Sequence, residues 1–487
     1  MQMNLKILLA MSQILFEIYG YAVFFYSFTL MLTYVALMYL AARGYYRNKN
    51  YVDDSYAKMV VNTSPFTPGV SIIAPAFNEE KTIVDNVKSL LSQQYPLYEV
   101  IIVNDGSKDS TLQKLIDYFD LKVAPFSYEE KLQTRPFKAL YRSVNPVFKN
   151  LTVVDKENGG TKADPVNCGL NVAQYEYFIN TDVDCILELD AIYQCMLPIF
   201  KNPEIIAVSG MMTMSNGCTI ENGMITKLAP PKNPIPLFQE LEYLRSFVIG
   251  KMGWSSVNAM SNVSGGFGLF KRDVCIQAGG YSPDSFAEDM DVLFRMIAYC
   301  CENNIKYRVV QIPKTCCRTE GPNSLYMLNR QRTRWGRGLI QVFHLHYHML
   351  FNYKYHRIGL LTIPYVFIYE LCAPVIEFMG FFVFVYLLLN NEINWLAATI
   401  IGASVYAFFL MLSSVVIFFT YKMQCEYKHL SQYIPLALAA TVEPLFYHPL
   451  IVLFSLRGYF EYIIGKKAVW KTIARKGYDS TDKSKQS

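Results

Sequence analysis

Long apolar stretches lie toward both ends of the chain, and they constrain its fold more than any other feature. They cover residues 5–42, 359–390, 394–421 and 431–464, and they are long enough to include helices that cross a bilayer. Of the 487 residues, 17% are charged and 52% are apolar, which is too apolar a composition for an ordinary soluble enzyme. We therefore expect a polar middle domain held between membrane segments.

The basic residues beside the first apolar stretch indicate its orientation. Residues 21–42 are long enough to span a bilayer, and the basic segment 43–49 follows at once, which places that end in the cytoplasm. Residues 5–19 form either a second span or a helix in the membrane plane, and Glu17 favours the second alternative. No small-residue cleavage site follows a short apolar core, so we do not expect a removed signal peptide.

The apolar stretches near the carboxyl terminus are harder to orient. The loop 390–393 carries no Lys or Arg and is expected outside, whereas the basic residues of 422–428 mark an inside loop. The basic tail 466–487 is expected in the cytoplasm, although a single span over 431–464 would put it outside. That last stretch is therefore either one full span, or broken or re-entrant at Glu443-Pro444.

Three glutamates lie inside these apolar stretches, namely Glu370, Glu377 and Glu443. Ionisable residues at membrane depth usually face a bundle interior or a polar pathway. A carboxylate tolerated near the membrane interface is the other interpretation, and the sequence leaves both open for each glutamate.

The middle of the chain alternates strands and helices, which is typical of a parallel sheet with crossover helices. Buried strands are predicted at 70–76, 100–105, 151–154, 177–181, 205–211 and 308–312. A helix is predicted over about 287–301, with acidic residues in its first turn, where they suit the positive end of the helix dipole. The polar insertion 122–150 has no assigned role.

Asp182 and Asp184 directly follow the predicted strand 177–181. Side chains at the carboxyl end of a strand in an open α/β sheet project into the crevice where ligands bind. Two carboxylates at this spacing suit Mg²⁺ or Mn²⁺ held jointly with substrate phosphates. A solvated turn is the simpler alternative for this pair taken alone.

Other carboxylates follow neighbouring structural cues: Glu79 and Asp105 each follow a strand, and Asp289 opens the predicted helix. Transfer from a nucleotide-activated sugar needs such an array, because a metal must neutralise the departing diphosphate and a separate carboxylate must take the proton of the acceptor.

Charge and cysteine usage exclude some other classes. The net charge of +5 is mild and does not indicate a nucleic-acid partner. Eleven cysteines occur without a regular spacing, which favours a reduced cytoplasmic setting over disulfides or zinc. His344 and His348 could share a helix face, but the surrounding aromatic residues favour a membrane interface over a metal site.

Six motifs in order resemble the processive family-2 glycosyltransferases, the membrane synthases of cellulose, chitin, hyaluronan and poly-N-acetylglucosamine. They are Pro75-Ala-Phe-Asn-Glu79, Asn104-Asp-Gly-Ser-Lys-Asp-Ser-Thr111, Asp182-Val-Asp184, Ser264-Gly-Gly-Phe-Gly268, Ala287-Glu-Asp289 and Gln331-Arg-Thr-Arg-Trp335. The resemblance covers about residues 70–337, and the flanking membrane segments fit the same layout. It implies an α/β GT-A-like nucleotide-sugar transferase domain plus α-helical transmembrane segments.

The resemblance also implies roles at the donor site. Asp105 is expected to contact the uracil or ribose, beside the loop Ala76–Glu79. Lys162 is expected near the nucleotide and diphosphate, Asp182 near the donor, and Asp184 on the metal, Mg²⁺ or Mn²⁺.

The remaining roles concern the acceptor. Asp289 is expected to be the base that deprotonates the acceptor hydroxyl. The residues expected to bind the acceptor or the diphosphate are Ser264, Gly265, Glu288, Gln331, Arg334 and Trp335. Taken singly, each has a structural alternative, such as a capped turn for Asp105 or an interface anchor for Trp335.

Two positions depart from the family pattern: Ala287 stands where Thr is common, and Pro165 stands where a small residue is usual. Neither departure removes a catalytic group. The short tail after Trp470 leaves no room for the cyclic-dinucleotide-binding domain of many cellulose synthases, so the product is expected to resemble poly-N-acetylglucosamine, chitin or hyaluronan.

The expected function is therefore processive, inverting polymerisation of a β-linked polysaccharide from a UDP-sugar, with UDP-N-acetylglucosamine preferred, and passage of the chain into or across the membrane. The alternatives are transfer of one sugar to a lipid carrier, and a non-catalytic scaffold. The partners are the UDP-sugar, the growing polysaccharide and the bilayer of a cell membrane, with an accessory membrane subunit left open. The expected units are 1–50 (membrane), 51–69 (linker), 70–337 (cytoplasmic transferase), 338–357 (interfacial helix), 358–465 (membrane) and 466–487 (tail).

Overall fold

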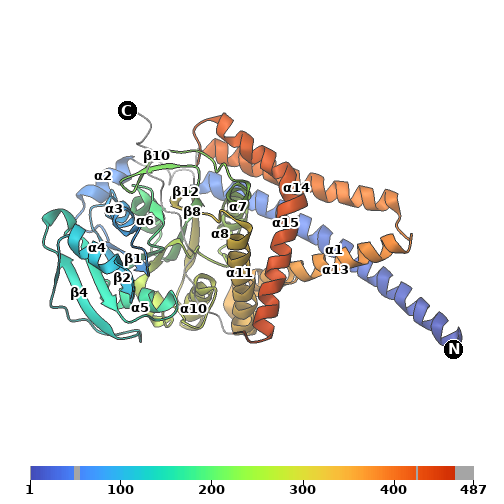
Figure 1. Ribbon diagram of the computed structural model, residues 1–487, viewed down its shortest axis with the longest axis horizontal. Coiled ribbons are helices and arrows are strands. Elements are labelled where there is room, and N and C mark those ends of the chain that lie inside the picture. The colour runs from blue at the N-terminus through green and yellow to red at the C-terminus, as the bar shows by residue number, and fades with distance from the viewer. Residues whose placement is uncertain (1, 49–54, 424–425, 467–487) are drawn as a thin grey trace.

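The computed structural model describes residues 2–48, 55–423 and 426–466, and its side chains over 18–46, 58–423 and 426–466. An α/β domain occupies one end of the molecule, and long helices extend from it toward the other end (Figure 1). Most of the predicted tail, from residue 467 onward, lies outside the described residues.

A ten-stranded mixed sheet with the order β3-β4-β5-β2-β1-β6-β11-β8-β12-β7 forms the centre of the α/β domain. Its strands are β1 (Val70–Ala76), β2 (Tyr98–Asp105), β3 (Leu121–Val123), β4 (Phe137–Ser143), β5 (Leu151–Lys156), β6 (Tyr177–Thr181), β7 (Ile186–Leu187), β8 (Ile205–Met214), β11 (Phe267–Lys271) and β12 (Arg308–Thr319). A separate hairpin joins β9 (Thr219–Glu221) to β10 (Met224–Lys227). Strands β5, β2, β1 and β6 run parallel, as the strand–helix alternation predicts.

Helices cover both faces of the sheet, and each face has its own apolar core. In β2, Val100 and Ile102 pack into one core while Ile101 and Val103 pack into the other, because successive side chains of a strand point to opposite faces. The helices of the domain are α3 (Ile83–Leu91), α4 (Thr111–Tyr118), η2 (Pro146–Phe148), α5 (Ala163–Val172), α6 (Ala191–Lys201), α7 (Pro234–Arg245), α8 (Met252–Ser256), α9 (Arg272–Gln277) and α10 (Glu288–Glu302). A π-helical segment, η3 (Ser246–Lys251), joins α7 to α8.

The sheet extends further than the sequence predicts. Strands β8 and β12 lengthen to Met214 and Thr319 because they pair with each other in parallel along most of their length. The predicted insertion 122–150 contributes β4, which pairs antiparallel with β5 near the sheet edge. Strand β11 was not predicted, and it inserts antiparallel between β6 and β8.

Five long helices lie in the described residues, and all but the second of them overlap the predicted apolar stretches. They are α1 (Gln2–Asn48), α11 (Leu325–His346), α13 (Ala373–Leu389), α14 (Trp395–Met423) and α15 (Ile434–Ile463). Shorter elements are α2 (Ser55–Thr63), η4 (Tyr347–Met349), η5 (Tyr353–Tyr355), η6 (Ile358–Thr362), α12 (Ile363–Tyr365), η7 (Val366–Leu371) and η8 (Leu430–Tyr433). Within the described residues, four helices are long and apolar enough to cross a membrane: Ile18–Tyr46, Ile358–Leu389, Trp395–Met423 and Leu430–Ile463.

Two predicted divisions fall inside continuous helices. Residues 5–19 continue into α1 without a break, so the prediction of a separate amino-terminal element is wrong. The expected boundary at residues 337 and 338 lies within α11, which therefore joins the Gln-x-x-Arg-Trp motif and the start of the expected interfacial segment in one helix.

Helix α15 is arranged differently from the other apolar helices. Helices α1, α13 and α14 extend away from the sheet, and the turn between α13 and α14 lies at the far end of the molecule (Figure 1). Both ends of α15 instead contact the α/β side: Gln432 donates to the carbonyl of Leu228 over 2.8 Å, and Arg337 of α11 donates to the carbonyl of Lys466 over 2.5 Å. The helix is continuous through the predicted break at Glu443.

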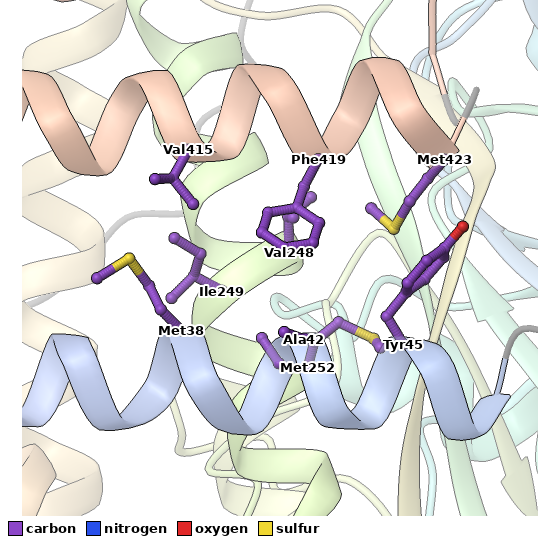
Figure 2. A pocket seen from close by; sticks show the side chains of 10 residues that line it. Met38, Ala42, Tyr45, Val248, Ile249, Met252, Val415, Phe419 and Met423 are labelled. Atoms are coloured by element: carbon purple, nitrogen blue, oxygen red, sulfur yellow. The ribbon is translucent and has the colours of Figure 1, made fainter.

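Helices α1 and α14 hold η3 and α8 between them. Figure 2 shows their apolar side chains around a cavity of about 10 Å³, with Met38 from α1 and Val415 and Phe419 from α14. Ile249 of η3 and Met252 of α8 complete the contact. The position of η3 therefore depends on the long apolar helices as well as on the α/β domain.

The three glutamates in the apolar stretches have different surroundings. Glu443 is 2% exposed and accepts two hydrogen bonds from Arg245 of α7, one of them over 2.6 Å. Glu377 lies 2.8 Å from His448 Nε2 of α15. Glu370 of η7 lines the large groove described next. The positions of Glu443 and Glu370 agree with the interpretation that they face a bundle interior or a polar pathway, whereas Glu377, whose side chain is 40% exposed, leaves both interpretations open.

Candidate active site

The candidate site forms where the strand order of the parallel sheet reverses. From β1, the chain adds β2 and β5 on one side and β6 on the other, so the carboxyl ends of β1 and β6 lie next to each other. Ligands of open α/β sheets bind in the crevice at such a point. Ala76, Asp105 and Asp182 all lie at this edge, because they end or directly follow β1, β2 and β6.

One groove of about 1300 Å³ brings together every site residue predicted from the sequence. Its lining includes Ala76, Glu79, Asp105, Lys162, Asp182, Asp184, Ser264, Gly265, Glu288, Asp289, Gln331, Arg334 and Trp335. The groove then continues to Glu370 and Tyr459, which belong to the apolar helical region.

Asp105 is held at the end of β2 by three donors. Its carboxylate accepts from Lys156 Nζ over 3.1 Å, from Asn158 Nδ2 over 3.1 Å and from the Gly159 N–H over 2.9 Å. Burial raises the pKa of Asp105, while the Gly159 and Lys156 contacts oppose that shift. Lys156 is fully buried and also pairs with Asp164. The carboxylate is therefore positioned before any ligand binds.

The loop after β1 is fastened to the loop after β2. The Asn78 N–H donates to Ser107 Oγ over 3.0 Å, the Glu79 N–H donates to Thr111 Oγ1 over 2.8 Å, and the Lys108 N–H donates to Asn78 Oδ1 over 2.8 Å. These contacts fix both loops on the side of the groove where Asp105 lies.

Asp182 and Asp184 lie close enough to share a cation. Oxygens of Asp182 and Asp184 and the sulfur of Cys185 all lie within 4.8 Å of one another. The two carboxylates fit Mg²⁺ or Mn²⁺, whereas the buried Cys185 sulfur is a soft ligand that these ions do not prefer. Lys162 Nζ lies 2.6 Å from Asp182 Oδ1, so a cation bound by Asp182 would share that carboxylate with a lysine ammonium.

The Lys162 ammonium connects two parts of the groove, because it also donates to the carbonyl of Gly265 over 2.6 Å. Burial lowers the pKa of Lys162, but the carboxylates of Asp182 and Glu288 outweigh burial and raise it overall. Lys162 therefore stays charged where the diphosphate is expected.

The segment before β11 runs between the donor carboxylates and Asp289. In the register of β11 with β6, Phe267 pairs with Thr181, which places Gly266 beside Asp182. A Cβ on Gly266 would lie 3.4 Å from Asp182 Oδ2, and one on Gly265 would lie 3.4 Å from Asp289 Oδ2. Glycine at these positions leaves both carboxylates open to the groove.

Asp289 and Glu288 open α10. Asp289 Oδ1 accepts from the Met290 N–H over 2.9 Å, and a carboxylate in the first helical turn is favoured by the helix dipole. Glu288 is 7% exposed, and burial, with the Asp289 charge next, raises its pKa against the opposing charges of Arg334 and Lys162.

An aromatic and charged wall faces these carboxylates from α11 and α7. Trp335 lies parallel to Tyr243 of α7, with 6.5 Å between ring centroids and 20° between planes. The Arg332 guanidinium lies 4.3 Å from the Trp335 ring and donates twice to Glu242, each time over 2.6 Å. The Trp335 ring is therefore fixed between two partners.

Several groove residues were not predicted from the sequence, namely Glu242, Tyr243, Lys251 and Arg332. The first three lie on α7 and η3, for which no helix was predicted. A usable signal was the spacing of Gln239, Glu242, Tyr243 and Ser246, which puts these polar side chains on one face of a helix.

Two family models match parts of this chain. Residues 71–133 match the model described as "Glycosyl transferase family 2", and residues 238–421 match "Glycosyl transferase family group 2". The chain is 28% and 30% identical over 270 residues to two sequences named poly-beta-1,6-N-acetyl-D-glucosamine synthase from Staphylococcus epidermidis. Each match covers 55% of this chain and 54% of the relative, so it spans about half of the relative's length.

Two solved structures are also similar. A mannosyltransferase from Pyrobaculum calidifontis, in complex with GDP-Man and Mn²⁺, is 16% identical, with a TM-score of 0.49 over 90% of this chain and 99% of that chain. S. aureus TarS residues 1–349, in complex with UDP-GlcNAc, is 16% identical, with a TM-score of 0.35 over 56% of this chain and 66% of that chain.

The family models, the sheet topology and the motifs at the carboxyl ends of its strands agree with one another. The chain belongs to the family-2 glycosyltransferases and combines a GT-A-like α/β domain with long apolar helices.

Proposed function

We propose that this protein polymerises a β-linked polysaccharide from UDP-N-acetylglucosamine, processively and with inversion, and passes the chain toward the membrane. The observation that carries this proposal is the course of the groove, which runs from Asp105 past Asp289 to Glu370 and Tyr459 on candidate membrane helices. A growing chain needs a continuous path away from the transfer site. The names of the staphylococcal relatives support the choice of sugar.

The transfer step uses Asp289 as the general base. The acceptor hydroxyl oxygen attacks the anomeric carbon of the donor, and its proton passes to the Asp289 carboxylate. The bond from that carbon to the diphosphate breaks, and UDP leaves with the electron pair. Attack from the side opposite the diphosphate converts an α-linked donor into a β-linked product.

The donor is held on the other side of Gly265. Asp105 binds the uracil or ribose, and Lys162 lies beside the diphosphate because it is tied to Asp182 and to the Gly265 carbonyl. When bound, Mg²⁺ or Mn²⁺ held by Asp184 supplies neutralisation of the negative charge that develops on the leaving diphosphate.

The α/β domain is proposed to lie in the cytoplasm, with α1, α13 and α14 crossing the membrane. Basic residues follow α1 and the end of α14 on the side of the sheet, and the loop between α13 and α14 lies at the opposite end (Figure 1). The bilayer would then surround the exposed apolar side chains of these three helices.

Helix α15 is proposed to lie in the membrane plane. Both of its ends contact the α/β side, and exposed apolar residues recur along its outer face at Leu438, Leu445, Leu453 and Phe460. This arrangement keeps the basic tail in the cytoplasm. A reporter fused after Ser487 tests it, because activity of a reporter that works only outside the cell would require α15 to cross the membrane.

The function is tested with purified protein in lipid and a panel of radiolabelled UDP-sugars. A high-molecular-weight product formed from UDP-N-acetylglucosamine, and digested by a hydrolase specific for β-linked N-acetylglucosamine, is expected. The Asp289→Asn variant is the control and should form no polymer. A lipid-soluble product carrying a single sugar would instead identify a non-processive transferase, and absence of donor turnover would identify a scaffold.

A further inference from the structure

The lining of the groove includes charged residues that the transfer step does not use, among them Lys251 and Glu370. Each lies in a π-helical segment, Lys251 at the end of η3 and Glu370 next to the end of η7. A π-helical turn adds a residue to a helix and is frequently found at functional sites. Two π-helical segments that are far apart in the sequence thus present side chains of opposite charge to the same groove.

Lys251 has no anionic partner of its own. Its ammonium lies 4.6 Å from the centre of the Phe247 ring. Among the described residues, no carboxylate oxygen lies within 4.0 Å of it, and it donates no hydrogen bond. Burial lowers the pKa of Lys251 to about 8, and the more distant charges of Asp289 and Glu370 oppose that shift. Within the part of the chain that the structure describes, the ammonium therefore has no acceptor to which it donates.

Glu370 is similarly unpaired, unlike the other two glutamates of the apolar stretches. Glu443 pairs with Arg245 and Glu377 pairs with His448, whereas no ion pair or side-chain hydrogen bond of Glu370 is formed within the described residues. Its backbone carbonyl accepts from the Tyr459 hydroxyl over 3.4 Å. A carboxylate in an apolar helical region is costly unless a polar group meets it.

The chemistry of this part of the groove fits a neutral sugar. Lys251 offers hydrogen-bond donors, Glu370 offers acceptors, and the nearby rings of Trp335 and Tyr243 offer flat faces on which a sugar ring can lie. A phosphate group fits this part of the groove poorly. The carboxylates of Asp289 and Glu370 are near enough to affect the charge of Lys251, and they would repel a phosphate bound there.

We propose that Lys251 and Glu370 form an acceptor subsite, in which Lys251 donates hydrogen bonds to the oxygens of the sugar behind the reacting end and Glu370 accepts from its hydroxyl or amide groups. The inference rests on the proposed polymerase function and deepens it. The subsite orients the acceptor so that its terminal hydroxyl points at Asp289.

The test compares Lys251→Met, Lys251→Arg and Glu370→Gln with wild type in lipid, and Lys354→Met serves as the control. Lys354 pairs with Glu302 at the surface, far from the groove lining. Three quantities are measured for each protein: incorporation of N-acetylglucosamine into polymer, release of UDP by hydrolysis of the donor by water, and the KM for the donor. Hydrolysis by water needs the donor site but no acceptor sugar.

Loss of a hydrogen bond to a charged group should lower polymer formation about 10- to 100-fold in Lys251→Met and Glu370→Gln. Donor hydrolysis and the donor KM should stay within about twofold of wild type, and Lys251→Arg should restore part of the polymer yield. The product chains should also be shorter, because a weakly held acceptor dissociates sooner.

Two results would overturn the inference. Polymer yield and length equal to wild type in both variants would show that the subsite does not contact the acceptor. A parallel loss of hydrolysis and donor affinity would place Lys251 in the donor site or in the general fold. Failure of wild type itself to form polymer would instead reject the proposed function, so the two failures are distinguishable.

Discussion

Replacing Arg332 with Met should destabilise the protein and loosen the aromatic and charged wall that α11 and α7 form around Trp335. Arg332 is 4% exposed and donates to both oxygens of Glu242 over 2.6 Å, while its guanidinium covers Trp335 at 4.3 Å. Removing one partner of a buried ion pair typically costs about 3–5 kcal/mol. Glu242 is 31% exposed, so water can solvate the remaining carboxylate, and we expect a cost of about 2–4 kcal/mol.

A double-mutant cycle measures the interaction free energy between Arg332 and Glu242. Arg332→Met with Glu242→Gln removes the uncompensated carboxylate and should recover about half of the lost stability. The exposed pair Lys354–Glu302 provides the contrast, because both side chains are about half exposed and its loss should cost less than about 1 kcal/mol. Thermal unfolding in detergent, followed by the fluorescence of the four tryptophans, reports the difference.

The same variant should lose sugar transfer more than donor binding. Trp335 keeps its contact with Tyr243 but loses the contact with the guanidinium, so its ring is less well held where the acceptor is proposed to stack. We expect Arg332→Met to bind UDP normally and to form polymer at least about fivefold more slowly, since the lost cation–π contact alone is worth about 1 kcal/mol. Additive destabilisation in the double mutant, together with wild-type polymer synthesis in Arg332→Met, would refute the reasoning.

Three further changes are predicted. Asp184→Asn should abolish turnover that depends on Mg²⁺ or Mn²⁺, and near-normal activity at low metal concentration would reject the metal assignment. Asp289→Asn should lower polymer formation about 10²–10⁴-fold, while UDP binding measured by calorimetry is retained. If polymer formation does not fall, Glu288 becomes the candidate base. Burial, and then the charge of Glu426, raises the pKa of Glu240 to about 8, so the folded protein holds a proton that the unfolded chain loses near pH 4.5. Wild-type stability should therefore fall as pH rises through this window, and Glu240→Gln should flatten the dependence, as thermal unfolding across pH 5–9 would measure.

Residues at strand ends could be placed from the sequence because local patterns determine them. Asp105 and Asp182 each follow a run of buried β-branched or aromatic residues, and a parallel sheet brings such carboxyl ends to one edge whatever the details of its register. Asp289 could be placed for a similar reason, since acids open helices. In these cases a short segment contains all of the information needed.

Contacts between distant segments could not be predicted in this way. Lys156 looks like an ordinary lysine near a strand end, and its burial against Asp105 and Asp164 follows from the β2–β5 pairing. The course of α15 could not be predicted from the sequence either, because its apolar residues are equally compatible with a helix that crosses the membrane and with one that lies in the membrane plane. Its direction is set by contacts with Leu228 and Arg337, more than 100 residues away in sequence.

The helical wall formed by α7 and η3 is where the donor side and the membrane side of the molecule meet. Glu242 pairs with Arg332 of α11, and three residues later Arg245 pairs with Glu443 of α15, so neighbouring turns of α7 are fastened to two different long helices. Helices α1 and α14 then hold η3, which ends at Lys251 (Figure 2). The groups proposed to bind the donor are carried by the sheet and its loops, whereas the wall of α7 and η3 proposed to face the acceptor depends on packing with the apolar helices. A change in that packing should therefore alter transfer and chain length before it alters the affinity for UDP.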